Sequence, residues 1–322
     1  MIKDQWYAIL WSKELKEGKA VGVKRFGEKL LLYRDESGRA NCVADACAHR
    51  GASLSKGCVR SGRIQCPFHG IEYGRDGSCV FIPSEGRAAG NDYKRFKLKC
   101  YKTYEAGDII FVWYGEGEPE GKPDYFEIIE DKSFVYSHFN DHWGVDYSRV
   151  IENQLDVSHL AFVHKSTIGR GGKSLVNGPK VIWLDENTLQ TSANNEVDRG
   201  QTPKSAEESI IKNTNLTFKF PNMWLNHITD KIMVLAFFIP VDDENSIIAL
   251  RFYNRITGIR AIDSFIALFG KWANKIIERQ DKRIVETQLP KKSSLRMNEK
   301  LVSADMPIIK YRERREELIK KA

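Results

Sequence analysis

The stretches CAHRGA (residues 47–52) and CPFHG (residues 66–70) decide the fold of the first third of this chain. Each pairs one cysteine with one histidine, and in each a glycine follows shortly after the histidine. Glycine permits the left-handed backbone that tight turns need. The repeated design therefore predicts two similar loops that bring four side chains to one site: Cys47, His49, Cys66 and His69.

Thiolates and imidazoles in this order can hold one metal ion or a small iron–sulfur cluster. A structural zinc site usually groups two cysteines in one element and two histidines in another. A Rieske [2Fe-2S] cluster takes two cysteines on one iron and two histidines on the other. Two facing loops with one ligand of each kind would supply that set. The spacing favours the [2Fe-2S] cluster, with a zinc site as the alternative.

The composition is that of an ordinary globular protein with room for two domains: 322 residues, of which 42% are hydrophobic. All six cysteines lie in the first third, and in a reducing compartment such a group binds metal more often than it forms disulfides. No apolar run approaches the ~18 residues of a membrane span. We therefore expect a cytoplasmic protein without a membrane partner. The net charge of +7 is spread along the chain, so no nucleic-acid partner is predicted.

Two regions of different character are predicted, an all-β domain over residues 1–115 and a second domain over residues 116–322. Short strand-like runs and glycine-bearing turns fill the first. A polar segment rich in glycine and proline, residues 115–125, follows as the best linker. Longer apolar strands between residues 181 and 256 then precede a long helical pattern. This order is typical of an α+β fold in which a helix packs on an antiparallel sheet.

A second set of candidate metal ligands lies in ENQLDVSHLAFVHKS, residues 152–166. In a helix, Asp156 and His159 share one side, whereas His164 lies five residues further, about 140° round the axis. Both imidazoles can therefore reach one ion only if the helix ends or distorts between them. Non-haem iron(II) sites use two histidines and one carboxylate. Two histidines satisfied within the core are the plain alternative.

The third ligand is predicted on the long helix over residues 261–288. Asp281 falls on an apolar stripe that we expect to be buried, where an unpaired carboxylate would be costly and a metal-bound one would not. Glu278 and Glu286 lie off that stripe and are expected at the surface, and they are the alternative carboxylate ligands. The stripe has helical spacing and comprises Ile262, Phe265, Ile266, Phe269, Trp272, Ala273, Ile276, Ile277 and Ile284.

Together these motifs resemble the catalytic α subunits of Rieske non-haem iron oxygenases, most nearly the vanillate demethylases and the saxitoxin-pathway hydroxylases. The resemblance covers nearly the whole chain, including ERQDKRIVETQLP (residues 278–290) and DMPIIKYRER (residues 305–314). It implies an all-β Rieske domain followed by a helix-grip catalytic domain. It also implies that His159, His164 and Asp281 hold a mononuclear iron, and that the four loop residues hold the cluster.

The resemblance further implies an enzyme that takes O2, and electrons from NAD(P)H through a separate flavin- or ferredoxin-type reductase. Such an enzyme would hydroxylate or oxidatively demethylate a small organic substrate. Asp156 would bridge to the cluster of the next subunit in a homotrimer, or else be a carboxylate at a helix N-terminus. Asn153 would lie near the site, although its spacing from Asp156 departs from that of naphthalene-dioxygenase-type enzymes. A cis-dihydroxylating dioxygenase and a Rieske-type electron carrier are the alternatives.

Two further sets of residues are weaker candidates. Basic residues near the cysteine loops could attract an acidic ferredoxin-like partner: Arg50, Lys56, Arg60 and Arg63. The strands around residues 207–253 would line the substrate pocket, but alternate strand positions point to opposite faces, so about half of any such set should miss the pocket. The candidates are Asn213, Asn215, Phe218, Trp224, Asn226, His227 and Phe238.

Overall fold

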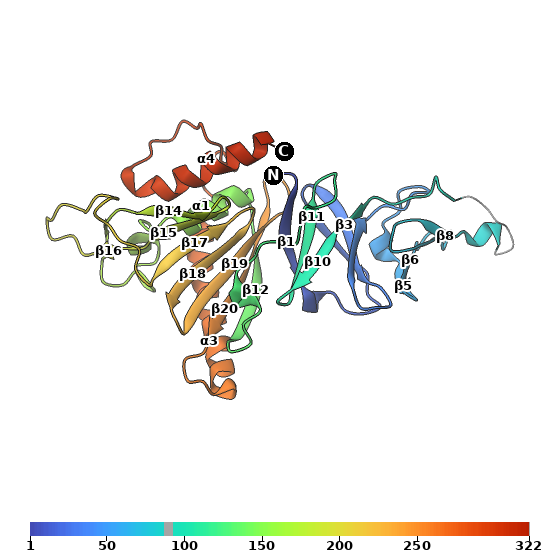
Figure 1. The fold of residues 1–322 in the computed structure, drawn as a ribbon, viewed down its shortest axis with the longest axis horizontal. Coiled ribbons are helices and arrows are strands. Elements are labelled where there is room, and N and C mark those ends of the chain that lie inside the picture. The colour runs from blue at the N-terminus through green and yellow to red at the C-terminus, as the bar shows by residue number, and fades with distance from the viewer. Residues whose placement is uncertain (87–92, 322) are drawn as a thin grey trace. The chain divides into compact units, whose positions relative to one another are not determined.

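The computed structural model describes residues 1–86 and 93–321 and shows two compact units (Figure 1). The N-terminal unit is Lys3–Asp124, and the C-terminal unit joins Met1–Ile2 to the chain from Tyr125 onward. The division falls inside the polar segment of residues 115–125. No helix in the described part of the chain is long and apolar enough to cross a membrane.

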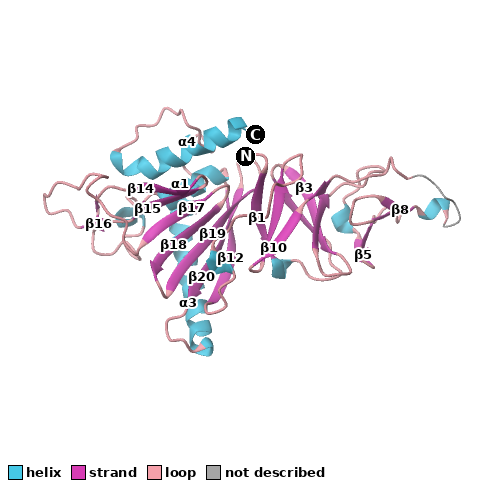
Figure 2. Cartoon of the chain, in the orientation of Figure 1, coloured by secondary structure: helices cyan, strands magenta, loops and turns pink. Residues whose placement is uncertain are grey.

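The N-terminal unit consists of three small antiparallel sheets, in the orders β1-β11-β10, β2-β3-β4-β9 and β5-β6-β7-β8 (Figure 2). The last of these sheets carries the cysteine loops, one before β5 and one between β6 and β7. The strands are β1 Gln5–Trp11, β2 Val21–Arg25, β3 Glu28–Arg34, β4 Ala40–Ala44, β5 Cys58–Arg60, β6 Arg63–Gln65, β7 Glu72–Tyr73, β8 Cys79–Phe81, β9 Cys100–Tyr101, β10 Thr103–Ala106 and β11 Ile109–Tyr114.

The C-terminal unit is built on a seven-stranded antiparallel sheet in the order β12-β20-β19-β18-β17-β15-β14. The predicted α+β architecture is confirmed. The elements are β12 Val135–Trp143, α1 Tyr147–Leu155, α2 Leu160–Val163, β13 Leu175–Val176, β14 Val181–Asp185, β15 Thr188–Ser192, β16 Asn195–Glu196, β17 Asn215–Lys219, β18 Met223–Thr229, β19 Ile232–Pro240, β20 Ser246–Asn254, α3 Arg260–Val285 and α4 Met306–Lys321. Short 3-10 turns occur at Ser12–Glu14, Leu54–Lys56, Pro83–Glu85, Glu127–Ile129 and Ser303–Asp305.

Helix α3 packs closely on β12 and β20. Ser137 of β12 donates a hydrogen bond to the backbone carbonyl of Ala267 on the helix. Gly270 is required at the contact, because a Cβ there would lie 2.3 Å from the ring of Phe252 on β20. The helix therefore approaches the sheet through small and polar residues, which fixes its direction across the two strands.

The prediction that the apolar stripe of α3 is its buried face is wrong. Its members Ile262, Phe265, Phe269, Trp272 and Ile284 are exposed. The buried residues of α3 are instead Asp263, Ala267, Glu278, Asp281 and Val285. The close approach of the helix to the sheet at Gly270 explains this choice, since large side chains on that face would hold the helix away.

Helix α1 is fixed to the C-terminal helix α4 by buried charges. The guanidinium of Arg312 donates to both oxygens of Glu152, at 2.7 and 2.8 Å. Arg149 donates to the same carboxylate at 3.2 Å and to the backbone carbonyl of Pro290. All three of these charged side chains are buried. The carboxylate of Glu299 pairs with both guanidinium groups and completes the cluster, which ties α1 to α4.

Candidate metal centres

The two cysteine loops have the same backbone conformation. The amide of each cysteine donates to the carbonyl five residues later: Cys47 to Ala52 and Cys66 to Ile71, both at 2.8 Å. The carbonyl of each cysteine accepts from the glycine four residues later, at 2.8 Å from Gly51 and 3.1 Å from Gly70. These glycines have φ of 72° and 70°, which disfavours any other residue. Two matched turns therefore present the four candidate ligands.

Within these turns the cysteines are buried and the histidines are exposed. The rings of His49 and His69 have centroids 4.8 Å apart. Burial raises the pKa of the Cys66 thiol, although the backbone amides of Phe68 and His69 point at its sulfur and act to lower it. All six cysteines of the chain are free thiols. The loops thus offer two inner sulfurs and two outer imidazoles.

Sequence reasoning missed Tyr73, whose hydroxyl lies 3.1 Å from Sγ of Cys47. This tyrosine is buried on β7, immediately after the second loop. Its hydroxyl can donate to the cysteine sulfur once the thiol has lost its proton on binding metal. The only available signal was a tyrosine four residues from His69, which is too weak a pattern to single out.

In the C-terminal unit, His159, His164 and Asp281 come together. Their ligand atoms lie within 4.8 Å of one another. Oδ1 of Asp281 is 3.4 Å from Nε2 of His159 and 3.0 Å from Nε2 of His164. Across residues 1–86 and 93–321 this is the only such group of three histidine, cysteine or acidic side chains. Among the described residues, those of the cysteine loops are not part of such a group.

Helical structure ends twice in this segment, once before His159 and once directly before His164, so the predicted interruption between the two histidines is present at the end of α2. Helix α1 ends at Leu155, and Asp156 follows it in an extended conformation with ψ of 132°. His159 then precedes the single turn α2, and His164 follows that turn. The two imidazoles are therefore carried by the two ends of a short turn, with ring centroids 5.1 Å apart.

Asp156 connects this group to its surroundings. Its Oδ2 lies 3.3 Å from Nδ1 of His159. Its Oδ1 accepts from the amide and the hydroxyl of Ser158, both at 2.6 Å. Burial acts to raise the pKa of Asp156, but the adjacent His159 imidazole and the hydrogen bonds from Ser158 outweigh it and the pKa is lowered. The alternative role for Asp156 was a carboxylate stabilised at a helix N-terminus. Asp156 instead lies at the C-terminal end of α1, where the helix dipole does not stabilise a negative charge.

Gln280 is a second residue that sequence reasoning missed. Its Oε1 lies 2.8 Å from Nδ1 of His164 and accepts from the hydroxyl of Thr167 at 2.8 Å. It fixes the imidazole ring so that Nε2 faces Asp281. Burial acts to lower the pKa of His164, but the Asp281 carboxylate outweighs it and the pKa is raised. The position of Gln280, directly before Asp281, was the signal available in the sequence.

The expected surface position of Glu278 is wrong. This residue is buried, and its Oε2 has no hydrogen-bond partner anywhere in the described chain. Burial raises the pKa of its carboxyl well above the ordinary value, and the charges of Asp281 and Asp141 add to the effect. It lies on the side of α3 that faces the sheet, one turn before Asp281. Glu286 is half-buried and accepts from the amide of Gly144 at 2.6 Å.

The predicted pocket residues divide between the two faces of the sheet. Paired residues share a face, and the register Ser137↔Phe252↔Val234↔Asn226 places Asn226 on the face that α3 covers. Trp224 lies on the same face, and Nε1 of Trp224 and Oδ1 of Asn226 find no partner among the described residues. Phe218 and Phe238 share that face but are fully buried in an aromatic cluster.

The remaining pocket candidates lie elsewhere. Asn215 and His227 are paired on the opposite face of the sheet. Asn213 precedes β17, and its backbone oxygen lies 2.6 Å from Nδ1 of His227. Of the seven candidates, Trp224 and Asn226 are therefore the two with polar side chains on the face of the sheet against which α3 packs.

Asn153 and Asp156 line a cleft of about 380 Å³ in the C-terminal unit, with Glu152, Asp305 and Arg312. Burial and the charge of Asp156 raise the pKa of Asp305. In this part of the structure Nδ2 of Asn153 is buried and makes no hydrogen bond to the described residues. Asp156 thus contacts His159 and also lines this cleft.

The four basic residues suggested as a docking surface are all exposed. The Arg50 guanidinium lies 5.8 Å from the ring centroid of Phe68, and Arg63 is 3.7 Å from a carboxylate oxygen of Glu72. All four lie between His49 and His69 in the sequence.

Two family models match the chain. The Rieske [2Fe-2S] domain matches residues 5–102, and the vanillate O-demethylase oxygenase C-terminal domain matches residues 143–321. The matched ranges contain both candidate metal centres.

Two curated relatives match just over half of this chain. Chlorophyllide a oxygenase, chloroplastic, of Chlamydomonas reinhardtii is 34% identical over 171 residues, which are 53% of this chain and 26% of the relative. The vanillate O-demethylase oxygenase subunit of Pseudomonas sp. (strain HR199 / DSM 7063) is 32% identical over 192 residues, which are 59% of this chain and 52% of the relative. The chain therefore aligns with about a quarter to a half of the length of these relatives.

The fold has close neighbours among solved structures. Dicamba monooxygenase bound to dicamba superposes with a TM-score of 0.77 at 20% identity, covering 100% of this chain and 98% of that one. The order of the two domains is the one that the sequence predicted. On the family models that match its two parts, the chain belongs to the Rieske oxygenases, with a Rieske [2Fe-2S] domain followed by a vanillate O-demethylase-type oxygenase domain.

Proposed function

We propose that this chain is the oxygenase component of a Rieske-type system that hydroxylates or oxidatively demethylates a small organic substrate. The observation that carries the proposal is the convergence of His159, His164 and Asp281 within 4.8 Å in a chain that also holds two matched Cys-His loops. The proposal includes a cytoplasmic homotrimer that receives electrons, originally from NAD(P)H, through a separate reductase or ferredoxin.

The side chains present fit the two groups that this function needs. Oδ1 of Asp281 is buried without a hydrogen-bond partner in the described chain, beside two imidazole nitrogens, which is the donor set of a non-haem iron(II) site. Two buried cysteines and two exposed histidines fit a [2Fe-2S] cluster. When bound, the cluster supplies single electrons and the iron combines them with dioxygen to oxidise a C–H bond.

The residues around the second site have separate tasks. Gln280 holds the His164 ring, and Asp156 holds the His159 ring, each through the imidazole nitrogen that does not face Asp281. Such contacts orient ligands and raise their basicity. Trp224 and Asn226, on the face that α3 covers, are the residues we assign to the substrate side of the site.

Asp156 is assigned to the electron path between copies of the chain. Its carboxylate contacts His159 on one side and lines the cleft of about 380 Å³ on the other. The exposed imidazoles of His49 and His69 can donate a hydrogen bond to a carboxylate in such a cleft on a neighbouring copy. A hydrogen-bonded connection of this kind would join the two centres across the interface.

Monooxygenation is favoured over cis-dihydroxylation, since the matching C-terminal family is that of vanillate O-demethylase oxygenases. Turnover under labelled dioxygen distinguishes the two. We expect one labelled oxygen atom in the hydroxylated product, or in the released aldehyde when the reaction is a demethylation. The other labelled atom leaves as water. Two labelled atoms in a diol product would overturn this choice.

The first experiment is anaerobic purification, followed by iron, zinc and acid-labile sulfide analysis and an electron paramagnetic resonance spectrum after reduction. We expect about three irons and two sulfides per chain, with the low average g of a histidine-ligated cluster. Zinc without sulfide would overturn the oxygenase assignment. About two irons with two sulfides and an empty second site would support an electron carrier instead.

A further inference from the structure

Helix α3 exposes a row of large apolar side chains to solvent. Phe265, Leu268, Phe269 and Trp272 are 60 to 66% exposed, and Ile262 is 45% exposed. These five residues are called the α3 apolar face below. The rings of Phe265 and Phe269 contact each other, with centroids 5.0 Å apart, so the face is continuous. Isolated exposed apolar residues are ordinary, but a contiguous row of this size marks an interaction surface.

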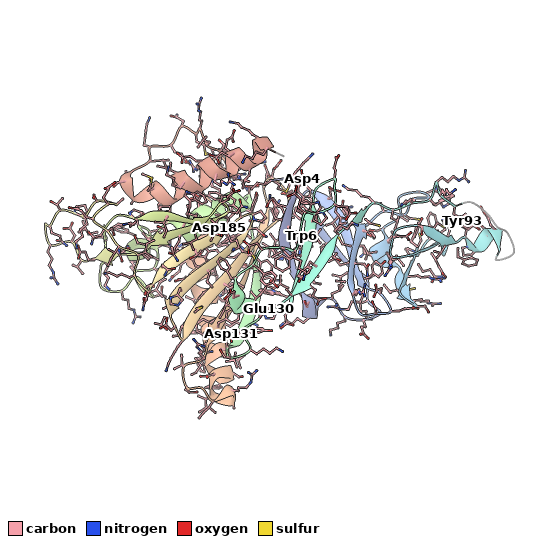
Figure 3. The ribbon with its side chains drawn as sticks, viewed as in Figure 1. Asp4, Trp6, Tyr93, Glu130, Asp131 and Asp185 are labelled. Carbon is pink, nitrogen blue, oxygen red and sulfur yellow. The ribbon has the colours of Figure 1, made fainter. Side chains whose placement is uncertain are left out.

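The α3 apolar face lies opposite the side of the helix that packs on the sheet. At about 100° per residue, its five residues fall within an arc of about 120°, and the arc centre is about 180° from the buried row. The buried row is Asp263, Ala267, Glu278, Asp281 and Val285. The first turns of α3 also extend beyond the sheet, with side chains projecting outward (Figures 1 and 3). The described part of the C-terminal unit therefore presents this face without covering it.

Two exposed basic residues adjoin the α3 apolar face. At about 100° per residue Lys275 lies about 20° beyond its edge, and Arg279 continues it further along the helix, whereas Lys271 and Arg260 lie nearer the buried row. Asp263 is the only acidic residue between residues 259 and 277, and it is buried. Its carboxylate accepts from the amides of Thr257 and Gly258, so it does not offset these charges at the surface. Acidic residues occur on the adjoining loop, at Glu130 and Asp131 (Figure 3).

We propose that the α3 apolar face binds the surface of an anionic lipid bilayer. A helix with aromatic and aliphatic residues on one side and lysine and arginine beside them lies in the plane of the membrane interface. Its apolar side enters the acyl boundary, and its cations contact lipid phosphates. Trp272 and the two phenylalanines are the residue types that favour this boundary.

The charge pattern favours a lipid surface over face-to-face pairing with a second copy of the chain. Pairing two of these faces would bring two basic flanks together, and this helix offers no exposed acid between residues 259 and 277 to compensate them. This proposal differs from the expectation of no membrane partner. That expectation considered only segments that could span a membrane. It is independent of the oxygenase chemistry proposed above.

Co-sedimentation of the full chain with vesicles tests the proposal. The probes are phosphatidylcholine vesicles and vesicles in which about one third of the lipid is phosphatidylglycerol. We expect binding to the anionic vesicles that weakens with added salt. Combining Phe265→Ser and Trp272→Ser should weaken the partition coefficient by at least about tenfold. The control combines Leu184→Ser and Ile210→Ser, which change equally exposed apolar residues elsewhere and should leave binding unchanged.

A charge variant and a hydrodynamic measurement complete the test. Lys275→Glu should weaken binding to anionic vesicles. Its ammonium also lies 5.6 Å from the ring centroid of Phe139, so the thermal unfolding midpoint is measured alongside to show that the variant is folded. Sedimentation velocity without lipid should be the same for the parent and the Phe265/Trp272 variant. The proposal is overturned if the parent does not bind anionic vesicles or if that variant binds as the parent does. A loss of oligomers in that variant without lipid binding would assign the face to a second copy.

Discussion

The two metal centres are built in different ways. The candidate cluster ligands lie between residues 47 and 69, and each half of the set belongs to one turn with its own hydrogen bonds. The candidate iron ligands lie between residues 159 and 281, on a loop after α1 and on α3. The first centre is therefore encoded locally, whereas the second exists only when α3 packs on the sheet.

This difference has consequences for variants. A change in a cysteine loop acts within that loop, since its backbone bonds close inside the turn. A change on α3 can act at the iron site, at the sheet or at the exposed face, because one helix serves all three. Selective loss of one centre with retention of the other is the clearest test of their independence.

The largest effect is expected for Asp281→Ala. The variant should lose mononuclear iron and turnover, because two imidazoles alone hold iron(II) weakly, while the spectrum of the cluster is retained. Iron per chain and the reduced cluster signal are the measurements. The control is Asp141→Ala, a carboxylate on β12 that faces the same helix and pairs with Lys282. A full iron content in Asp281→Ala would mean that another carboxylate is the ligand.

Asp156→Asn should slow electron transfer between the two centres while both keep their metals. We expect both metals to be retained and turnover to fall by about 10- to 100-fold or more, because the amide cannot replace the anionic connection to His159. The rate at which a pre-reduced cluster is reoxidised in the presence of substrate and oxygen measures the transfer. Asp305→Asn, in the same cleft, is the control. Reoxidation at the parent rate would rule out the bridging role.

Tyr73→Phe should act on the N-terminal centre alone. Loss of the hydroxyl near Sγ of Cys47 removes a hydrogen bond that stabilises the reduced cluster, so the reduction potential should fall by tens of millivolts. Iron at the second site should not change. Tyr33→Phe is a matched control, because Tyr33 is buried in the same core and its hydroxyl finds no partner among the described residues. Equal shifts in both variants would refute a role for that hydrogen bond.

The smallest effect concerns Glu278 in the metal-free protein. Its pKa is raised on folding, so the unfolded chain loses its proton first as pH rises above the ordinary value of 4.5. Folding stability is then lost until the pH passes the higher pKa of the folded state. Glu278→Gln removes this loss and should raise the free energy of unfolding at neutral pH by on the order of 1 kcal/mol.

Urea unfolding at acidic and neutral pH measures that difference. The gain should be near zero at a pH close to 4.5 and grow as the pH rises. The exposed Glu244→Gln serves as the control and should show no such trend. A gain that is equal at both pH values would show that Glu278 does not titrate differently in the folded state.

The form of the cysteine loops could be predicted from neighbouring residues alone. Their ligand types, glycines and short spacing act through turns whose hydrogen bonds join residues four or five apart, so the sequence alone predicted their form. Tyr73 was missed because its contact with Cys47 depends on how β7 returns past the first loop.

Helix α3 shows where local pattern fails. Its apolar period correctly predicted a long helix, and Asp281 is buried as expected. The period also predicted which face packs, and there it was wrong, because Gly270 lets the helix approach Phe252 through its small and polar side. Glu278 was misplaced for the same reason.

The sequence by itself determined the ligand types, the order of the two domains, the family and the existence of the main elements, because these follow from residue chemistry and short-range periodicity. The tertiary structure decided which face of α3 is buried, how His159 and His164 meet Asp281, and that Gln280 and Tyr73 support the two centres. Those outcomes depend on contacts between residues far apart in the chain, where the shape of the facing surface, and not hydropathy alone, selects the packing.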